Sequence, residues 1–136
     1  MSYDSSRIAL YTHLQNNITT IPIRFDSIKE DDPITNGNEL WIRCYIDPFD
    51  TNQSNLGTNN PLYETLGYLN IEIYDLEENG YADILRTADI IKSLYMRKSF
   101  NNGDLVIQKI KIIKRDVFAG WNNHVVSCFY IEKETI

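Results

Sequence analysis

Apolar and polar residues alternate along the segment 62–74, LYETLGYLNIEIY, and this pattern constrains the fold more than any other part of the sequence. Residues of one parity are aliphatic: Leu69, Ile71 and Ile73. Residues of the other parity are polar or aromatic: Tyr68, Asn70, Glu72 and Tyr74. Successive side chains of a strand point to opposite faces, so the pattern predicts a long antiparallel strand with one apolar face.

Other segments predict further strands. Residues 40–49 place one set of side chains on the apolar face, Ile42, Cys44 and Ile46. The opposite set is Trp41, Arg43, Tyr45 and Asp47. We expect this strand to pair with 62–74. We also expect a short extended segment at IPIRF (residues 21–25) and two strands at 105–113 and 125–131, which the connection KRDVFAGWNNH joins.

Two segments have helical periodicity. The first can be capped by Asp4 or Ser5 and ends near Asn17, and its apolar stripe is Ile8, Leu10, Tyr11, Leu14 and Ile18. The second follows a turn at 77–80, and its stripe is Tyr81, Ile84, Leu85, Ala88, Ile91 and Tyr95. Both stripes must be buried on one sheet. The 136 residues therefore predict a single α+β domain, 1–136, with an antiparallel or mixed sheet of four to five strands and two helices packed on one face.

Aromatic residues concentrate on the sheet face opposite the isoleucines: Trp41, Tyr45, Tyr68, Tyr74 and Tyr130. Such a surface predicts contact with a partner. Alternatively, the aromatics form cross-strand pairs that stabilise the sheet itself. We take Trp41, Tyr45, Tyr68 and Tyr74 as candidate interface residues.

Catalytic, metal and cofactor sites are not indicated. His13 and His124 are too far apart in sequence for metal-ligand spacing. His124 and Cys128 would lie on one strand roughly 13 Å apart, too far for proton transfer. Cys44 and Cys128 each sit in an apolar run, which predicts buried structural thiols. We therefore expect no enzyme activity and no cofactor.

Charge and hydropathy narrow the choice of partners. Thirteen basic residues against nineteen acidic give a net charge of -6, which disfavours nucleic-acid binding, although Lys109, Lys111, Lys114 and Arg115 form a local basic cluster. No apolar run approaches the roughly 20 residues that span a bilayer, so we expect no membrane contact. The carboxylates at 26–32 lack the ligand spacing of a calcium loop and indicate a solvated acidic loop.

Several short motifs occur in a consistent order. They are W-I-R at 41–43, Q-x-x-L-G at 53–57, G-x-L-x-I-x-I-Y at 67–74, A-D-x-I at 88–91 with Ile84 where an alanine is expected, and a loose G-W-x-x-x-V-x-x-x-F at 120–129. This order resembles the tail-terminator, or tail-completion, proteins of tailed bacteriophages, the class that includes the lambda tail terminator. The acidic insertion at 30–33 and the polar first helix depart from that pattern.

The resemblance implies a structural virion protein, assembled in the host cytoplasm and placed at the head-proximal end of the tail. Proteins of this family form rings, commonly hexameric, that cap the tail tube and offer a surface to the head. The implied partners are further copies of the chain, the tail tube protein and the head-tail connector, while DNA passes through without specific binding. A head-to-tail connector or neck subunit of similar fold, and a small intracellular binding module, are the alternatives.

Two polar regions acquire roles from this resemblance. We interpret the first as an assembly loop, against the alternative of an idle surface hairpin: Thr51, Asn52, Gln53, Ser54, Asn55, Leu56, Gly57, Thr58, Asn59 and Asn60. The second consists of two groups of acidic residues: Glu30, Asp31 and Asp32, and Glu77 and Glu78. We expect at least one group to face the channel and repel DNA; the alternative is that both are solvated on the outer rim.

Overall fold

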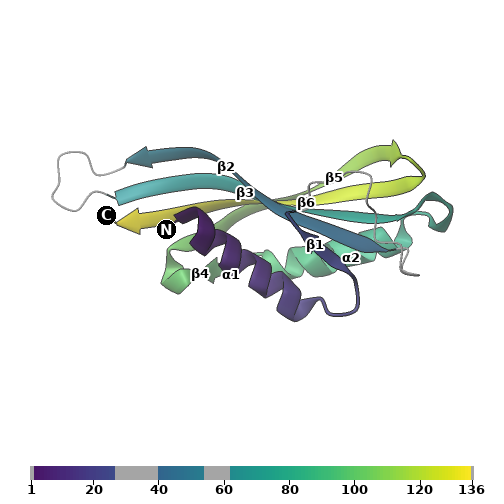
Figure 1. Ribbon diagram of the computed structural model, residues 1–136, viewed down its shortest axis with the longest axis horizontal. Helices are drawn as coiled ribbons and strands as arrows, with labels where there is room; N and C mark the ends of the chain where they lie inside the picture. Colours follow the sequence, from purple (N-terminus) through teal and green to yellow (C-terminus); the bar gives the residue numbers. More distant parts are fainter. Residues whose placement is uncertain (1, 27–39, 54–61, 136) are drawn as a thin grey trace.

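The computed structural model describes residues 2–26, 40–53 and 62–135 of the chain. Two helices, α1 (Ser2–Asn17) and α2 (Ala82–Tyr95), lie on the same face of a twisted sheet (Figure 1). The strands are β1 (Ile23–Phe25), β2 (Trp41–Gln53), β3 (Leu62–Leu76), β4 (Ser99–Phe100), β5 (Leu105–Phe118) and β6 (Trp121–Thr135). Two short 3-10 helices, η1 (Glu77–Asn79) and η2 (Asn101–Gly103), precede α2 and β5.

The sheet is mixed, with the strand order β1-β2-β3-β6-β5-β4. Strand β1 runs parallel to β2, and each other neighbouring pair is antiparallel. The predicted α+β class is confirmed, but the predicted count of four to five strands is wrong, because the described residues form six. Strand β1 lies inside the extended segment expected at residues 21–25, whereas β4, of two residues, is too short to show a period in the sequence.

The core lies between the helices and the aliphatic face of the sheet. The buried sheet residues include Ile42, Cys44, Ile46, Leu69, Ile71, Ile73, Val126 and Cys128. The buried helix residues include Leu10, Leu14, Ile84, Ala88, Ile91 and Tyr95. Ile8 and Leu85 do not join the predicted stripes, since they are 53% and 47% exposed. Each lies roughly 100° or more around its helix from the centre of the buried side.

Strand β2 is longer than its sequence suggests. The pairing with β3 follows the predicted faces, for example Cys44 with Ile71, and it continues past an irregularity between Pro48 and Asp50. Beyond it, Thr51, Asn52 and Gln53 pair with Thr65, Glu64 and Tyr63. The first three residues of the predicted assembly loop are therefore strand. The hydroxyl oxygens of Thr51 and Thr65 lie 3.3 Å apart, a cross-strand pair that supports this extension.

Tyr130 lies on the helix-covered face, and its expected place among the opposite aromatics is wrong. It is 1% exposed and packs in the core. Its ring takes the space that a side chain at its register partner Gly67 would fill, since a Cβ there would lie 2.5 Å from the phenol. The glycine creates the site for the ring, so Tyr130 and Gly67 form one packing unit.

The segment predicted to connect the last two strands is mostly strand. β5 continues to Phe118 and β6 begins at Trp121, which leaves Ala119 and Gly120 as a two-residue turn. Both turn residues have positive φ, 52° and 84°, as a type I′ hairpin turn requires. Positive φ is unusual for alanine, so the sequence carries only half of the usual signal for this hairpin.

Candidate assembly surface on the second face of the sheet

A buried carboxylate, Glu72, organises the face of the sheet opposite the helices, since its neighbours in β3, Ile71 and Ile73, belong to the core, and it is 0% exposed. Its Oε1 accepts hydrogen bonds from Arg43 Nε and the Tyr74 hydroxyl, both at 2.7 Å, and Arg43 Nη2 lies 2.6 Å away. Its Oε2 accepts from Arg115 Nη1 at 2.9 Å and the Tyr45 hydroxyl at 3.1 Å. Two guanidiniums and two phenols thus satisfy both oxygens. We call these five residues the Glu72 network.

The Glu72 network joins three strands. Arg43 and Tyr45 come from β2, and Arg115 reaches from β5 across β6. Burial raises the pKa of Tyr45 and of Tyr74, and their hydrogen bonds to Glu72 raise it further, so both phenols remain donors at neutral pH. Burial alone would lower the pKa of Arg43, but the charge of Glu72 raises it. The network is therefore a fixed structural link with a formal surplus of one positive charge.

Aromatic stacking extends the network toward the start of β2. Trp41 stacks on Tyr74 with ring centroids 4.4 Å apart and planes inclined by 12°. Trp121 meets Trp41 edge-on, with centroids 6.1 Å apart. Trp41 is only 7% exposed, so its contacts are made mainly inside the chain.

An exposed aromatic patch lies on the same face, toward the far end of β2. Phe49, at the irregularity in β2, stacks on Tyr68 of β3 with centroids 5.2 Å apart and on Phe129 of β6 at 6.1 Å. Tyr68 and Phe129 are 5.6 Å apart. Phe49 is 52% exposed and Tyr68 is 40% exposed. We call Phe49, Tyr68 and Phe129 the aromatic triad. Exposed clustered aromatics are typical of surfaces that contact another protein.

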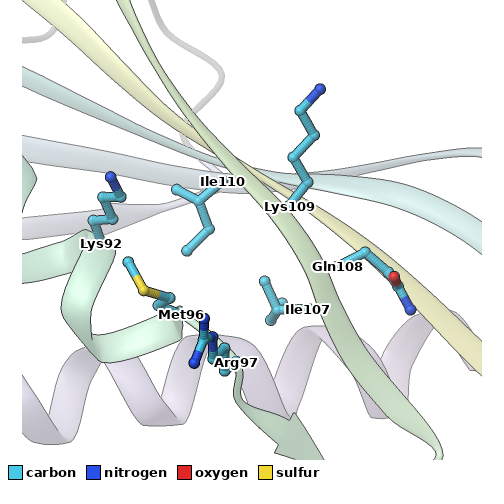
Figure 2. A pocket seen from close by; sticks show the side chains of 7 residues that line it. All are labelled: Lys92, Met96, Arg97, Ile107, Gln108, Lys109 and Ile110. Carbon is cyan, nitrogen blue, oxygen red and sulfur yellow. The ribbon is translucent and has the colours of Figure 1, made fainter.

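Opposite charges flank the aromatic triad. The register pairs Asp47 with Tyr68, Tyr68 with Phe129, and Phe129 with Lys109. Directly paired residues share a face, so all four side chains lie on the second face of the sheet. Figure 2 shows Lys109 extending away from the space between β5 and α2, into which Ile110 turns.

The helix side of β5 borders a pocket of about 210 Å³ beside the end of α2. Its lining residues are Lys92, Met96, Arg97, Ile107, Gln108, Lys109 and Ile110 (Figure 2). The lining combines apolar side chains with cations and contains no carboxylate, thiol, hydroxyl or imidazole. This chemistry suits contact with an apolar or acidic surface and supplies no acid-base pair.

The predicted interface aromatics fall into two groups. Tyr68 is exposed and belongs to the aromatic triad. Trp41, Tyr45 and Tyr74 are buried or half-buried and serve the Glu72 network and its stacking. Three of the four aromatics thus stabilise the sheet, and the interface role stays a prediction for Tyr68, which is exposed.

The polar regions are only partly described. Residues 54–60 of the predicted assembly loop and the candidate lumenal acids Glu30, Asp31 and Asp32 lie outside the described residues. Glu77 and Glu78 lie on η1 and are exposed. The backbone N–H of Glu77 donates to the carbonyl of Gly120 at 2.9 Å, which ties η1 to the β5–β6 hairpin.

Sequence reasoning missed the Glu72 network and two members of the aromatic triad. The parity of Phe49 matches that of Trp41 and Tyr45, and the parity of Phe129 is opposite to that of Cys128, so alternation alone would have found both. Arg115 carried no such signal, because the sequence places it in a connection and not in a strand.

The histidines and cysteines lie apart from this surface. His13 Nε2 is 2.8 Å from the carbonyl oxygen of Leu94, and burial lowers the pKa of His124. Cys44 and Cys128 are buried free thiols, as predicted, and burial raises the pKa of Cys128 to about 12. Across residues 2–26, 40–53 and 62–135, no three His, Cys, Asp or Glu residues gather into a metal site. No helix in the same ranges is long and apolar enough to cross a membrane.

Comparison with known proteins adds information on the fold. No protein-family model and no curated protein sequence matches the chain. Fifteen chains of solved structures match it. One is a protein whose name states no function, with a TM-score of 0.68 and 16% identity over 97% of this chain and 96% of the other. This likeness shows a shared fold across nearly the whole length, and a shared fold does not determine function.

Proposed function

We propose that the chain is a ring-forming tail terminator of a tailed bacteriophage, located in the virion at the head-proximal end of the tail. In this role it caps the tail tube and offers the surface to which the head connector joins. The resemblance supports the proposal because its motifs lie on neighbouring parts of one sheet and its helix: W-I-R on β2, G-x-L-x-I-x-I-Y on β3 and A-D-x-I on α2.

The aromatic triad is the single observation that carries the proposal. A subunit of a ring must meet its neighbours through a surface that gains free energy on contact, and burial of apolar area provides about 25 cal/mol per Å². Phe49 and Tyr68 provide such apolar area, because 52% and 40% of their surfaces stay exposed in the described chain. The Glu72 network, farther along the same face, ties β2 and β3 to each other, and these two strands carry Phe49 and Tyr68, so much of the surface is already ordered before contact.

We further propose that at least one of the two acidic groups faces the channel through which DNA passes, and Glu77 and Glu78 are the candidates among the described residues. Both are exposed on η1, at the hairpin end of the sheet. Carboxylates there repel phosphates within a Debye length of about 8–10 Å, which keeps DNA moving without binding it.

The test is tail completion with variants of the aromatic triad. We expect Phe49→Ser and Tyr68→Ser to reduce completed tails by about tenfold or more, as central contact residues do. Ile8→Ser is the matched control, because Ile8 is similarly exposed, at 53%, but lies on α1. The control should complete tails normally. Wild-type completion by both triad variants would refute the role of this surface.

A further inference from the structure

One row of side chains across the second face is complementary to itself. Its order from β2 to β5 is Asp47, Tyr68, Phe129 and Lys109. Neighbouring strands lie about 4.8 Å apart, so Asp47 and Lys109 are separated by roughly 14 Å and do not pair within the chain. Among the described residues, neither forms an ion pair with another group. The row thus ends in two opposite charges separated by two aromatic rings.

We propose that two copies of this chain pair face to face through this row. A two-fold axis parallel to the strands, passing between Tyr68 and Phe129, reverses the row in the second copy. Asp47 of each copy then faces Lys109 of the other, and aromatic side chains meet aromatic side chains. Aligned packing of two sheets about 10 Å apart is a common arrangement.

The adjacent row supports the same axis. It runs Tyr45, Asn70, Ser127 and Lys111 from β2 to β5. Reversal about the axis places Lys111 of one copy against the ring of Tyr45 in the other. A lysine over a tyrosine ring is a favourable cation–π arrangement. Two successive rows therefore pair with themselves under one operation.

A second copy fits this row better than other partners. The row itself has no net charge, because Asp47 offsets Lys109. Lys111 and the Glu72 network add positive charge elsewhere on this face, so the self-complementary order of the row, and not the charge of the face, favours a second copy. A head-to-tail contact needs two different surfaces, whereas an isologous contact needs one self-complementary surface. This row is self-complementary, so it can form an isologous contact without a second surface.

This pairing goes beyond the proposed function and does not depend on it. A ring is built from head-to-tail contacts, so a two-fold pair that covers the aromatic triad describes the free protein and competes with assembly. Sedimentation measures the pair and tail completion measures the ring, so either can fail without the other.

The experiment measures the oligomeric state of the full chain by sedimentation velocity. At about 100 μM the wild type should be largely dimeric. Asp47→Lys and Lys109→Asp should each weaken the dimer by about tenfold or more, since each reversal turns two attractions into repulsions. Asp104→Lys and Lys98→Asp, exposed sites off this face, are controls with the same changes of net charge.

Mixing the two single variants gives the sharpest result. The Asp47→Lys variant has lysine at both 47 and 109, and the Lys109→Asp variant has aspartate at both positions. In a mixed pair each lysine therefore faces an aspartate, so both attractions return and the pair should form with close to wild-type affinity. A wild-type monomer, a dimer indifferent to both reversals, or a larger ring in place of the dimer would overturn the proposal.

Discussion

The substitution Glu72→Gln tests how strongly the Glu72 network holds the sheet. It keeps the size of the side chain but removes the charge and replaces one acceptor oxygen with an NH₂ donor. That donor must face at least one guanidinium or phenol that formerly donated to Glu72. The Arg43 side chain is 20% exposed and regains water poorly, whereas that of Arg115 is 45% exposed and regains it readily.

These exposures set the expected magnitude. Removing one partner of a fully buried ion pair costs about 3–5 kcal/mol, and the partial exposure of both arginines reduces that figure. We expect Glu72→Gln to lower the free energy of unfolding by about 2–3 kcal/mol. For a chain of this length the Tm should fall by roughly 10 °C.

Urea unfolding followed by tryptophan fluorescence is a suitable assay, because Trp41 and Trp121 lie beside the network. Glu78→Gln is the matched control, since Glu78 is exposed on η1 and its substitution should change stability by less than about 0.5 kcal/mol. A Glu72→Gln variant as stable as this control would refute the network as a structural link.

Three further predictions concern other parts of the fold. Gly67→Ala should lower the free energy of unfolding by about 1–3 kcal/mol, because the added Cβ would clash with the ring of Tyr130, and chemical denaturation measures the loss. Ala119→Asn should raise the Tm, with a gain of about 0.5–1 kcal/mol, because asparagine tolerates positive φ in a type I′ turn better than alanine does; an unchanged or lower Tm would contradict this. Cys44 and Cys128 should resist a thiol reagent at pH 7 in the native state and react in urea, because burial raises the pKa of both; rapid labelling of folded protein would contradict their burial.

The sequence predicts the central strands well because their side chains obey a period of two against a single apolar core. The faces of β2 and β3 and the burial of both thiols follow from that period. The extended segment expected at residues 21–25 contains β1, whereas the two-residue strand β4 escapes prediction, because its existence depends on its pairing with β5. The parity that Tyr130 shares with Cys128 places it in the core. A ring of this size fits there only because Gly67, on the neighbouring strand, leaves room for it, and that room is not visible in the sequence around Tyr130.

The candidate surface was predictable in part. Exposure of the second face could be inferred from its aromatics, but their division between contact and structure could not. That division depends on Glu72, which collects Tyr45, Tyr74 and two arginines from three strands and leaves Tyr68 outside the network. Residue spacing along one strand does not reveal a hub that joins several.

Electron cryo-microscopy of the phage particle that carries this chain tests the central claim most directly. The proposal predicts a closed ring of this subunit at the junction of tail tube and head, with the aromatic triad buried against a neighbouring subunit or the tube. A ring confined to the neck, above the tail end, would favour the connector alternative over a terminator. Absence of the chain from the particle, or copies that do not touch one another, would contradict the account.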